Sequence, residues 1–176
     1  MTIACLAWGS LVWDARDLPL GGPWHEDGAL LPIEFARESA DGRITLVVVG
    51  GGSRSPVLWA ELLVPDLEAA VAALAARESV LIRESIGRWP ARRGLSFPHQ
   101  DVIGSWAEER GLAGVVWTAL KPGMQGRRGF VPTLDELVRH LHGLDARSRD
   151  NAAAYIRNAP RQIRTAYRPA LEAELG

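Results

Sequence analysis

The sequence is poor in cysteine and lysine and has no long apolar run. Because Cys5 is the only cysteine, an internal disulfide and a cysteine-based zinc cluster are both excluded, and Cys5 is best interpreted as a small core residue. The only lysine, Lys121, follows no glycine-rich loop, which excludes a Walker-type phosphate loop. No run approaches the roughly 20 apolar residues of a membrane span, and the N-terminus lacks the basic segment of a leader. We therefore expect a cytoplasmic protein.

The chain also lacks an excess of charge of either sign. With 20 basic and 21 acidic residues its net charge is −1, so no overall field recruits nucleic acid or an anionic membrane. A hydrophobic fraction of 47% in 176 residues is typical of one globular domain with a sizeable core. The 7 tryptophans are scattered, which favours core and pocket walls over nucleic-acid stacking. We expect a small-molecule partner, with no nucleic acid and no membrane.

Apolar patterning predicts an α+β fold with an antiparallel or mixed sheet, open or closed into a barrel. The hairpin signal is strongest around Asp41-Gly42, which separates two apolar segments. Residues 17–29 and 87–101 are rich in turn formers and are predicted as loops. The predicted strands are 2–8, 31–39, 44–50, 57–64 and 114–120, and the predicted helices are 65–79, 132–143, 149–159 and 160–175.

The helix predicted over 65–79 places a carboxylate in line with its apolar face. Its stripe is Leu67, Val71 and Leu74, with Asp66 as the expected N-cap. Eleven residues at ~100° each bring Glu78 back to within roughly 20° of Leu67. If the helix extends that far, Glu78 faces the core side.

Such a carboxylate has the character of a general base. Partial burial and the negative end of the helix dipole disfavour its charged form, whereas pairing with Arg77 or Arg83 favours it. A carboxylate shifted toward neutrality suits proton transfer. The alternative is that the helix ends by Ala76, which leaves Glu78 in a turn, exposed or in a salt bridge.

The apolar segment "CLAWGSLVW" is interrupted at Gly9-Ser10, directly after the first predicted strand. Glycine allows close approach of the backbone, and serine adds a hydroxyl group. The interruption predicts either a simple bend or a loop that holds a ligand on backbone N–H groups.

Together, Gly9-Ser10-Leu11 and Arg77-Glu78 resemble the gamma-glutamylcyclotransferase-like superfamily, including its ChaC type. Those proteins carry a Tyr-Gly-Ser loop after the first strand and a Glu after the first long helix. The resemblance covers roughly residues 3–85. It departs at Trp8, which stands where the family has Tyr, so the loop of this chain carries no phenolic hydroxyl of its own.

The resemblance implies a single domain over 1–176, with a mixed-sheet barrel core (1–125) and a helical tail packed on it (126–176). It implies cyclisation of a γ-glutamyl amine or peptide to 5-oxoproline and a free amine, with Glu78 as general base and no metal or organic cofactor. The residues expected to hold the γ-glutamyl head are Trp8, Gly9, Ser10 and Leu11. The alternative is a non-catalytic binding or regulatory relative that keeps the fold.

Two further motifs remain open to a binding role. Residues 50–53, Gly-Gly-Gly-Ser, are interpreted as a hairpin turn, because no helix N-terminus follows to complete a phosphate site. Arg161, Arg164 and Arg168 share one face of the last predicted helix. They form either a solvated ridge or a contact for a carboxylate or phosphate.

Overall fold

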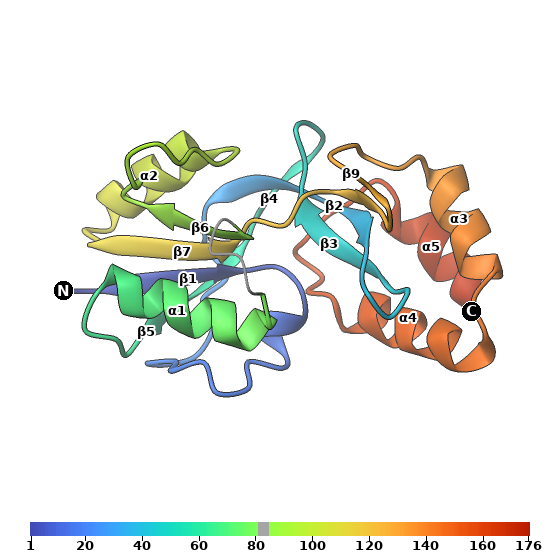
Figure 1. The fold of residues 1–176 in the computed structure, drawn as a ribbon, viewed down its shortest axis with the longest axis horizontal. Helices are drawn as coiled ribbons and strands as arrows, with labels where there is room; N and C mark the ends of the chain where they lie inside the picture. Colours follow the sequence, from blue (N-terminus) through green and yellow to red (C-terminus); the bar gives the residue numbers. More distant parts are fainter. Residues whose placement is uncertain (81–84) are drawn as a thin grey trace.

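The computed structural model describes residues 1–80 and 85–176 and has a mixed α+β architecture with two sheets (Figure 1). The first sheet has the strand order β5-β1-β7-β6. Strand β1 is antiparallel to β5 and parallel to β7, and β6 is antiparallel to β7. The bounds are Ile3–Ala7 for β1, Leu58–Leu62 for β5, Ile86–Trp89 for β6 and Gly114–Thr118 for β7.

The second sheet is built around a long strand, β2, and has the order β3-β2-β8-β9 with β4 also paired to β2. Strands β2 and β3 form the antiparallel hairpin expected at Asp41-Gly42, where Gly42 has a φ of 81°. The bounds are Leu30–Glu38 for β2, Ile44–Val48 for β3, Arg54–Pro56 for β4, Gly123–Met124 for β8 and Arg127–Arg128 for β9.

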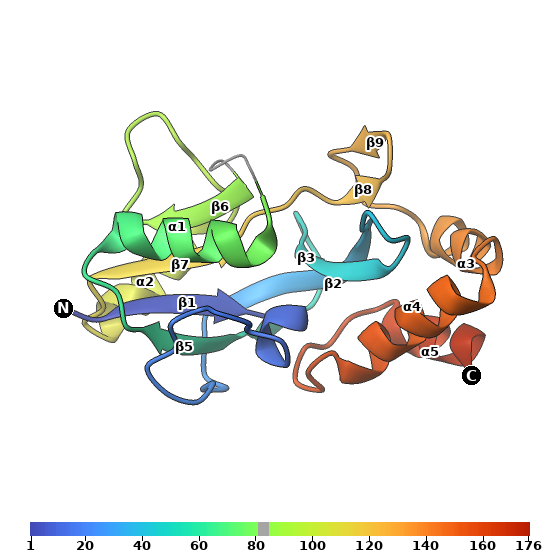
Figure 2. The ribbon, with the colours of Figure 1, turned by 60° about the horizontal axis from the view of Figure 1, so that its bottom comes forward.

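Strand β1 is buried on both faces, which explains its unbroken apolar sequence. Successive side chains of a strand point to opposite faces. Ile3 and Cys5 accordingly pack with helix α1 (Leu67–Glu78), whereas Ala4 and Leu6 pack with helix α2 (Gln100–Glu109) and the second sheet. The two helices thus cover opposite faces of the first sheet (Figure 2).

Three further helices pack beyond the second sheet, at the end of the molecule opposite the N-terminus (Figure 1). They are α3 (Leu134–His142), α4 (Ala146–Asn158) and α5 (Arg168–Leu175). The capping box of Thr133 and Glu136 forms as expected at the start of α3. In the described part of the chain, no helix has the length and apolar character that crossing a membrane requires.

Several boundaries differ from the sequence prediction. The loop predicted over 87–101 is confirmed for 90–99, but its two ends are wrong, because β6 extends to Trp89 and α2 begins at Gln100. A Cβ at Gly87 would collide with the ring of Trp117, so this strand depends on a tertiary contact that local sequence does not reveal. The strand order leaves both sheets open among the described residues, and the barrel is not confirmed. The segment 126–176, expected as a helical tail, also contributes β9.

The last predicted helix is also shorter than expected, since α5 begins at Arg168 and Pro169 lies in its first turn. Arg161, Arg164 and Arg168 therefore do not share a helix face. Arg161 and Arg164 are exposed between α4 and α5, whereas Arg168 is buried. The guanidinium of Arg168 donates hydrogen bonds to backbone carbonyls that end α4 and link it to α5: those of Ile156, Ala159, Pro160 and Ile163.

This cluster gives a test of tail stability. Replacing Arg168 by Met leaves several buried carbonyls without donors, and we expect the free energy of unfolding to fall by about 3 kcal/mol. Arg161→Met is the matched control, because Arg161 pairs with the same Glu172 oxygen as Arg168 but is exposed. Its expected loss is below about 0.5 kcal/mol. Equal losses in urea unfolding would show that the carbonyl contacts contribute nothing.

Candidate functional site

A cavity of about 430 Å³ lies where the loop after β1, the end of α1, the β2–β3 hairpin and α4 meet. Its wall brings together every residue that the sequence predicts for the site, although the first and last are about seventy positions apart in the chain. These residues are Trp8, Gly9, Ser10, Leu11 and Glu78.

The loop after β1 turns into the cavity through a short 3-10 turn, η1 (Ser10–Val12). The turn is closed by the amide of Val12 donating to the carbonyl of Gly9 at 3.0 Å and by Asp14 donating to Ser10 at 2.8 Å. Gly9 precedes the turn without a side-chain cap. The interruption of the apolar segment is therefore a bend, as the first interpretation predicts, and this bend lines a cavity; ligand binding by its backbone N–H groups stays a prediction.

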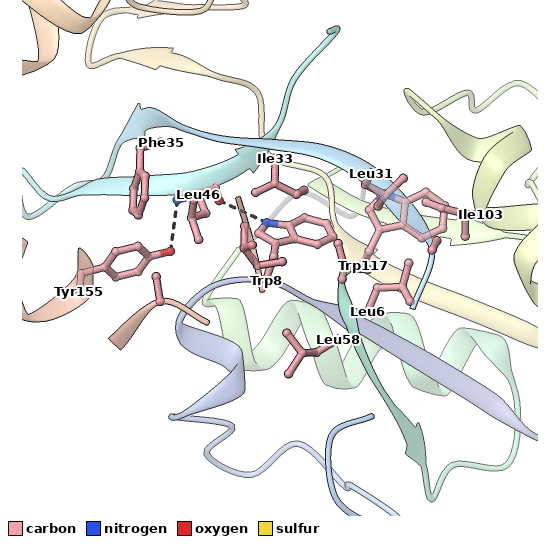
Figure 3. Close-up of a cluster of buried hydrophobic side chains, with 14 of the residues drawn as sticks. Leu6, Trp8, Leu31, Ile33, Phe35, Leu46, Leu58, Ile103, Trp117 and Tyr155 are labelled. Carbon is pink, nitrogen blue, oxygen red and sulfur yellow. Dashed lines mark hydrogen bonds between the residues drawn. The ribbon is translucent and has the colours of Figure 1, made fainter. Parts of the chain in front are cut away.

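Trp8 borders the cavity, but its indole packs into the core. The side chain is buried, and its Nε1 donates to the carbonyl of Leu46 at 3.3 Å (Figure 3). This bond joins the loop of the first sheet to strand β3 of the second. The indole thus anchors the loop through the edge of the neighbouring sheet.

Tyr155, from α4, places a phenolic hydroxyl against the loop, and the sequence analysis missed it. A Cβ on Gly9 would overlap with this hydroxyl, so glycine is required for the close approach. Tyr155 accepts a hydrogen bond from the amide of Leu46 at 3.3 Å (Figure 3). Its only local signal is a place on the buried stripe of α4, which is equally typical of a core residue.

The hydroxyl of Tyr155 remains protonated. Burial raises its pKa to about 12, and the smaller effects of backbone hydrogen bonds from Leu46 and Ser10 act the other way. The amide of Leu46 donates to the hydroxyl oxygen, and a protonated phenol on a residue of the cavity wall still has its own O–H to donate. Tyr155 can therefore donate to a ligand oxygen.

Glu78 is the last residue of α1, so the alternative in which the helix ends by Ala76 is wrong. Ser79 then adopts a left-handed conformation with a φ of 55° and ends the helix. The Glu78 side chain is 16% exposed and receives a hydrogen bond from Arg77 Nη1 to Oε1 at 2.7 Å. The helix end thus holds a largely buried carboxylate at the cavity wall.

Arg77 connects this carboxylate to the loop. Its guanidinium is buried and also donates to the carbonyl of Asp14 and, at 3.4 Å, to the hydroxyl of Ser10. Of the two expected partners for Glu78, Arg77 is therefore the one found; Arg83 lies outside the described residues.

The arrangement combines a proton acceptor with hydrogen-bond donors. The carboxylate of Glu78 can take a proton, and the hydroxyl of Tyr155 and the backbone amides of the loop can stabilise a developing oxyanion. No group of three His, Cys, Asp or Glu side chains that could hold a metal ion occurs within 1–80 and 85–176.

No family model and no curated protein sequence matches the chain. Among solved structures, it is similar to a yeast gamma-glutamyl cyclotransferase described as specific to glutathione. The identity is 14% and the TM-score 0.49, over 99% of this chain and 98% of the other. A likeness at this level assigns no activity to the chain.

The contact between Gly9 and Tyr155 can be tested by a double-mutant cycle. Gly9→Ala forces a methyl group into the Tyr155 hydroxyl, and we expect a loss of about 1–3 kcal/mol in the free energy of unfolding. In a Tyr155→Phe background that oxygen is gone, so the same substitution should cost less by at least about 1 kcal/mol. Additive losses in chemical denaturation would contradict the contact.

Proposed function

We propose that this protein cyclises γ-glutamyl compounds, releasing 5-oxoproline and a free amine, with Glu78 as the general base. The main support is that the Glu78 carboxylate lies in the wall of the same cavity as the Gly9–Leu11 loop. A base and a set of backbone donors around one cavity of about 430 Å³ suit a small polar substrate.

In this reaction the α-amine nitrogen of the γ-glutamyl group attacks its own γ-carbonyl carbon. A C–N bond forms, the carbonyl oxygen becomes an oxyanion, and Glu78 takes the proton lost by the attacking nitrogen. The original amide C–N bond then breaks, and Glu78 returns the proton to the departing amine. Because nucleophile and electrophile belong to one molecule, the protein needs to hold a bent conformer rather than collect two substrates.

Three other groups complete the proposed machinery. Arg77 is a positioning residue that holds the Glu78 carboxylate beside the loop. The backbone amides of the loop and the hydroxyl of Tyr155 donate to the oxyanion. Tyr155 would thereby supply, from α4, the phenol that is missing from the loop because position 8 is Trp.

The base is tested by Glu78→Gln, assayed for 5-oxoproline on a panel of γ-glutamyl amino acids and γ-glutamyl alkylamides. We expect kcat to fall by about 10²- to 10⁴-fold, since the amide retains the shape but takes no proton. Glu68→Gln at the exposed start of the same helix is the control and should retain activity. Full turnover by the Glu78→Gln variant would exclude Glu78 as the base.

The same panel tests the alternative that the protein binds a γ-glutamyl ligand without converting it. The motivation for this alternative is Trp8, because its buried indole gives the loop no phenolic hydroxyl. A binding or regulatory protein would show a rise in Tm with a γ-glutamyl ligand but release no 5-oxoproline.

The role of Tyr155 is tested by the pH dependence of Tyr155→Phe. A hydroxyl with a pKa of about 12 stays protonated through the assay range, so its contribution as a donor should be constant. We expect kcat of the variant to be lower by about 10- to 100-fold at every pH from about 7 to 10. A deficit that grows toward high pH would show that the tyrosine acts as a titrating base instead, because only the ionised phenolate takes a proton.

A further inference from the structure

Most of the charges that line the cavity are paired. Arg77 contacts Glu78 at 2.7 Å, and Arg43 Nε lies 2.7 Å from an Asp41 oxygen. Arg16 Nε lies 3.4 Å from a carboxylate oxygen of Asp14. Among the residues of the cavity wall that the structure describes, these pairs leave one cationic side chain to be accounted for.

That side chain is Arg37, in β2. Its Nη1 donates to the backbone carbonyl of Lys121 at 2.6 Å, and it forms no ion pair with any carboxylate of residues 1–80 or 85–176. A guanidinium has five N–H donors, so one carbonyl leaves most of them available. Burial lowers the pKa of Arg37, and the nearby cation of Arg128 lowers it further. An anion beside Arg37 would favour its charged form and so counteract both causes of the lowered pKa.

The backbone explains how this side chain reaches the cavity. The register of β2 against β3 shifts between Phe35 and Arg37, and such an irregularity redirects the residues that follow it. Arg37 then pairs with Thr45 across the hairpin, and both line the cavity. Arg37 therefore comes from β2 of the second sheet, whereas Glu78 ends α1, the helix on the first sheet. Figure 2 shows these two elements.

We propose that Arg37 binds a carboxylate group of the ligand. A planar guanidinium matches a carboxylate with two parallel hydrogen bonds, which a lysine cannot reproduce. The identity of the ligand as a γ-glutamyl compound rests on the proposed function. Within such a compound the carboxylate comes either from the γ-glutamyl head or from the amine portion, as in a γ-glutamyl amino acid.

The test compares γ-glutamylalanine with γ-glutamyl ethylamide, which lacks the carboxylate of the amine portion. For Arg37→Gln we expect KM to rise by about 10- to 100-fold with little change in kcat. A rise confined to γ-glutamylalanine assigns Arg37 to the amine portion, and a rise with both compounds assigns it to the head. Unchanged KM for both would overturn the proposal.

Two controls address charge and folding. Arg54→Gln removes an exposed arginine of β4 outside the cavity wall and should leave both KM values unchanged. Arg37→Lys keeps the positive charge without the planar group, so its KM should lie between those of the wild type and Arg37→Gln. If Arg37→Gln does not fold, the Lys variant carries the test, and wild-type KM values for it with both compounds would overturn the proposal.

A binding measurement separates this proposal from the proposed function. If neither compound is converted, the cyclase assignment fails, but carboxylate binding is still measured by the rise in Tm with γ-glutamylalanine. A rise in the wild type that is lost in Arg37→Gln supports the site without any catalysis. A rise in Tm of equal size in the wild type and in Arg37→Gln, or no rise in the wild type, overturns the proposal.

Discussion

The candidate site depends on the hydrogen bonds donated by the buried guanidinium of Arg77. It donates to the Glu78 carboxylate, to the carbonyl of Asp14 and to the hydroxyl of Ser10. These bonds fix the end of α1 against the turn that follows β1, although the two segments are far apart in sequence. A buried charge is costly unless it is paired and hydrogen-bonded, and here the loop carbonyl and the carboxylate meet that requirement together.

A second set of contacts brings the C-terminal helices into the same site. The backbone of Leu46 accepts from the indole of Trp8 and donates to the hydroxyl of Tyr155, so one residue of β3 lies between the loop and α4. The buried Arg168 holds α4 to α5 and thereby supports the helix that carries Tyr155. The wall of the cavity thus draws residues from both sheets, from the end of α1 and from α4.

Those parts of the fold and of the candidate site that depend on a local sequence pattern could be predicted, because such a pattern favours one structural interpretation. The apolar stripe of α1 led to Glu78, and the glycine after β1 indicated the loop. Tyr155 and Arg37 could not be found in this way, because a buried tyrosine on a helix and an arginine near a strand end are common without any function. The roles proposed for them rest on tertiary contacts. Strand β6 likewise depends on a tertiary contact, since Gly87 leaves room for the ring of Trp117.

The measurement that tests the central claim most directly is product analysis of the wild-type protein incubated with a γ-glutamyl amino acid. If Glu78 assists attack by the substrate's own amine, mass spectrometry will detect 5-oxoproline and the free amino acid in equal amounts, with no glutamate formed. Release of glutamate would mean that water is the nucleophile. That result would contradict intramolecular cyclisation and the role assigned to the cavity between the loop and α1.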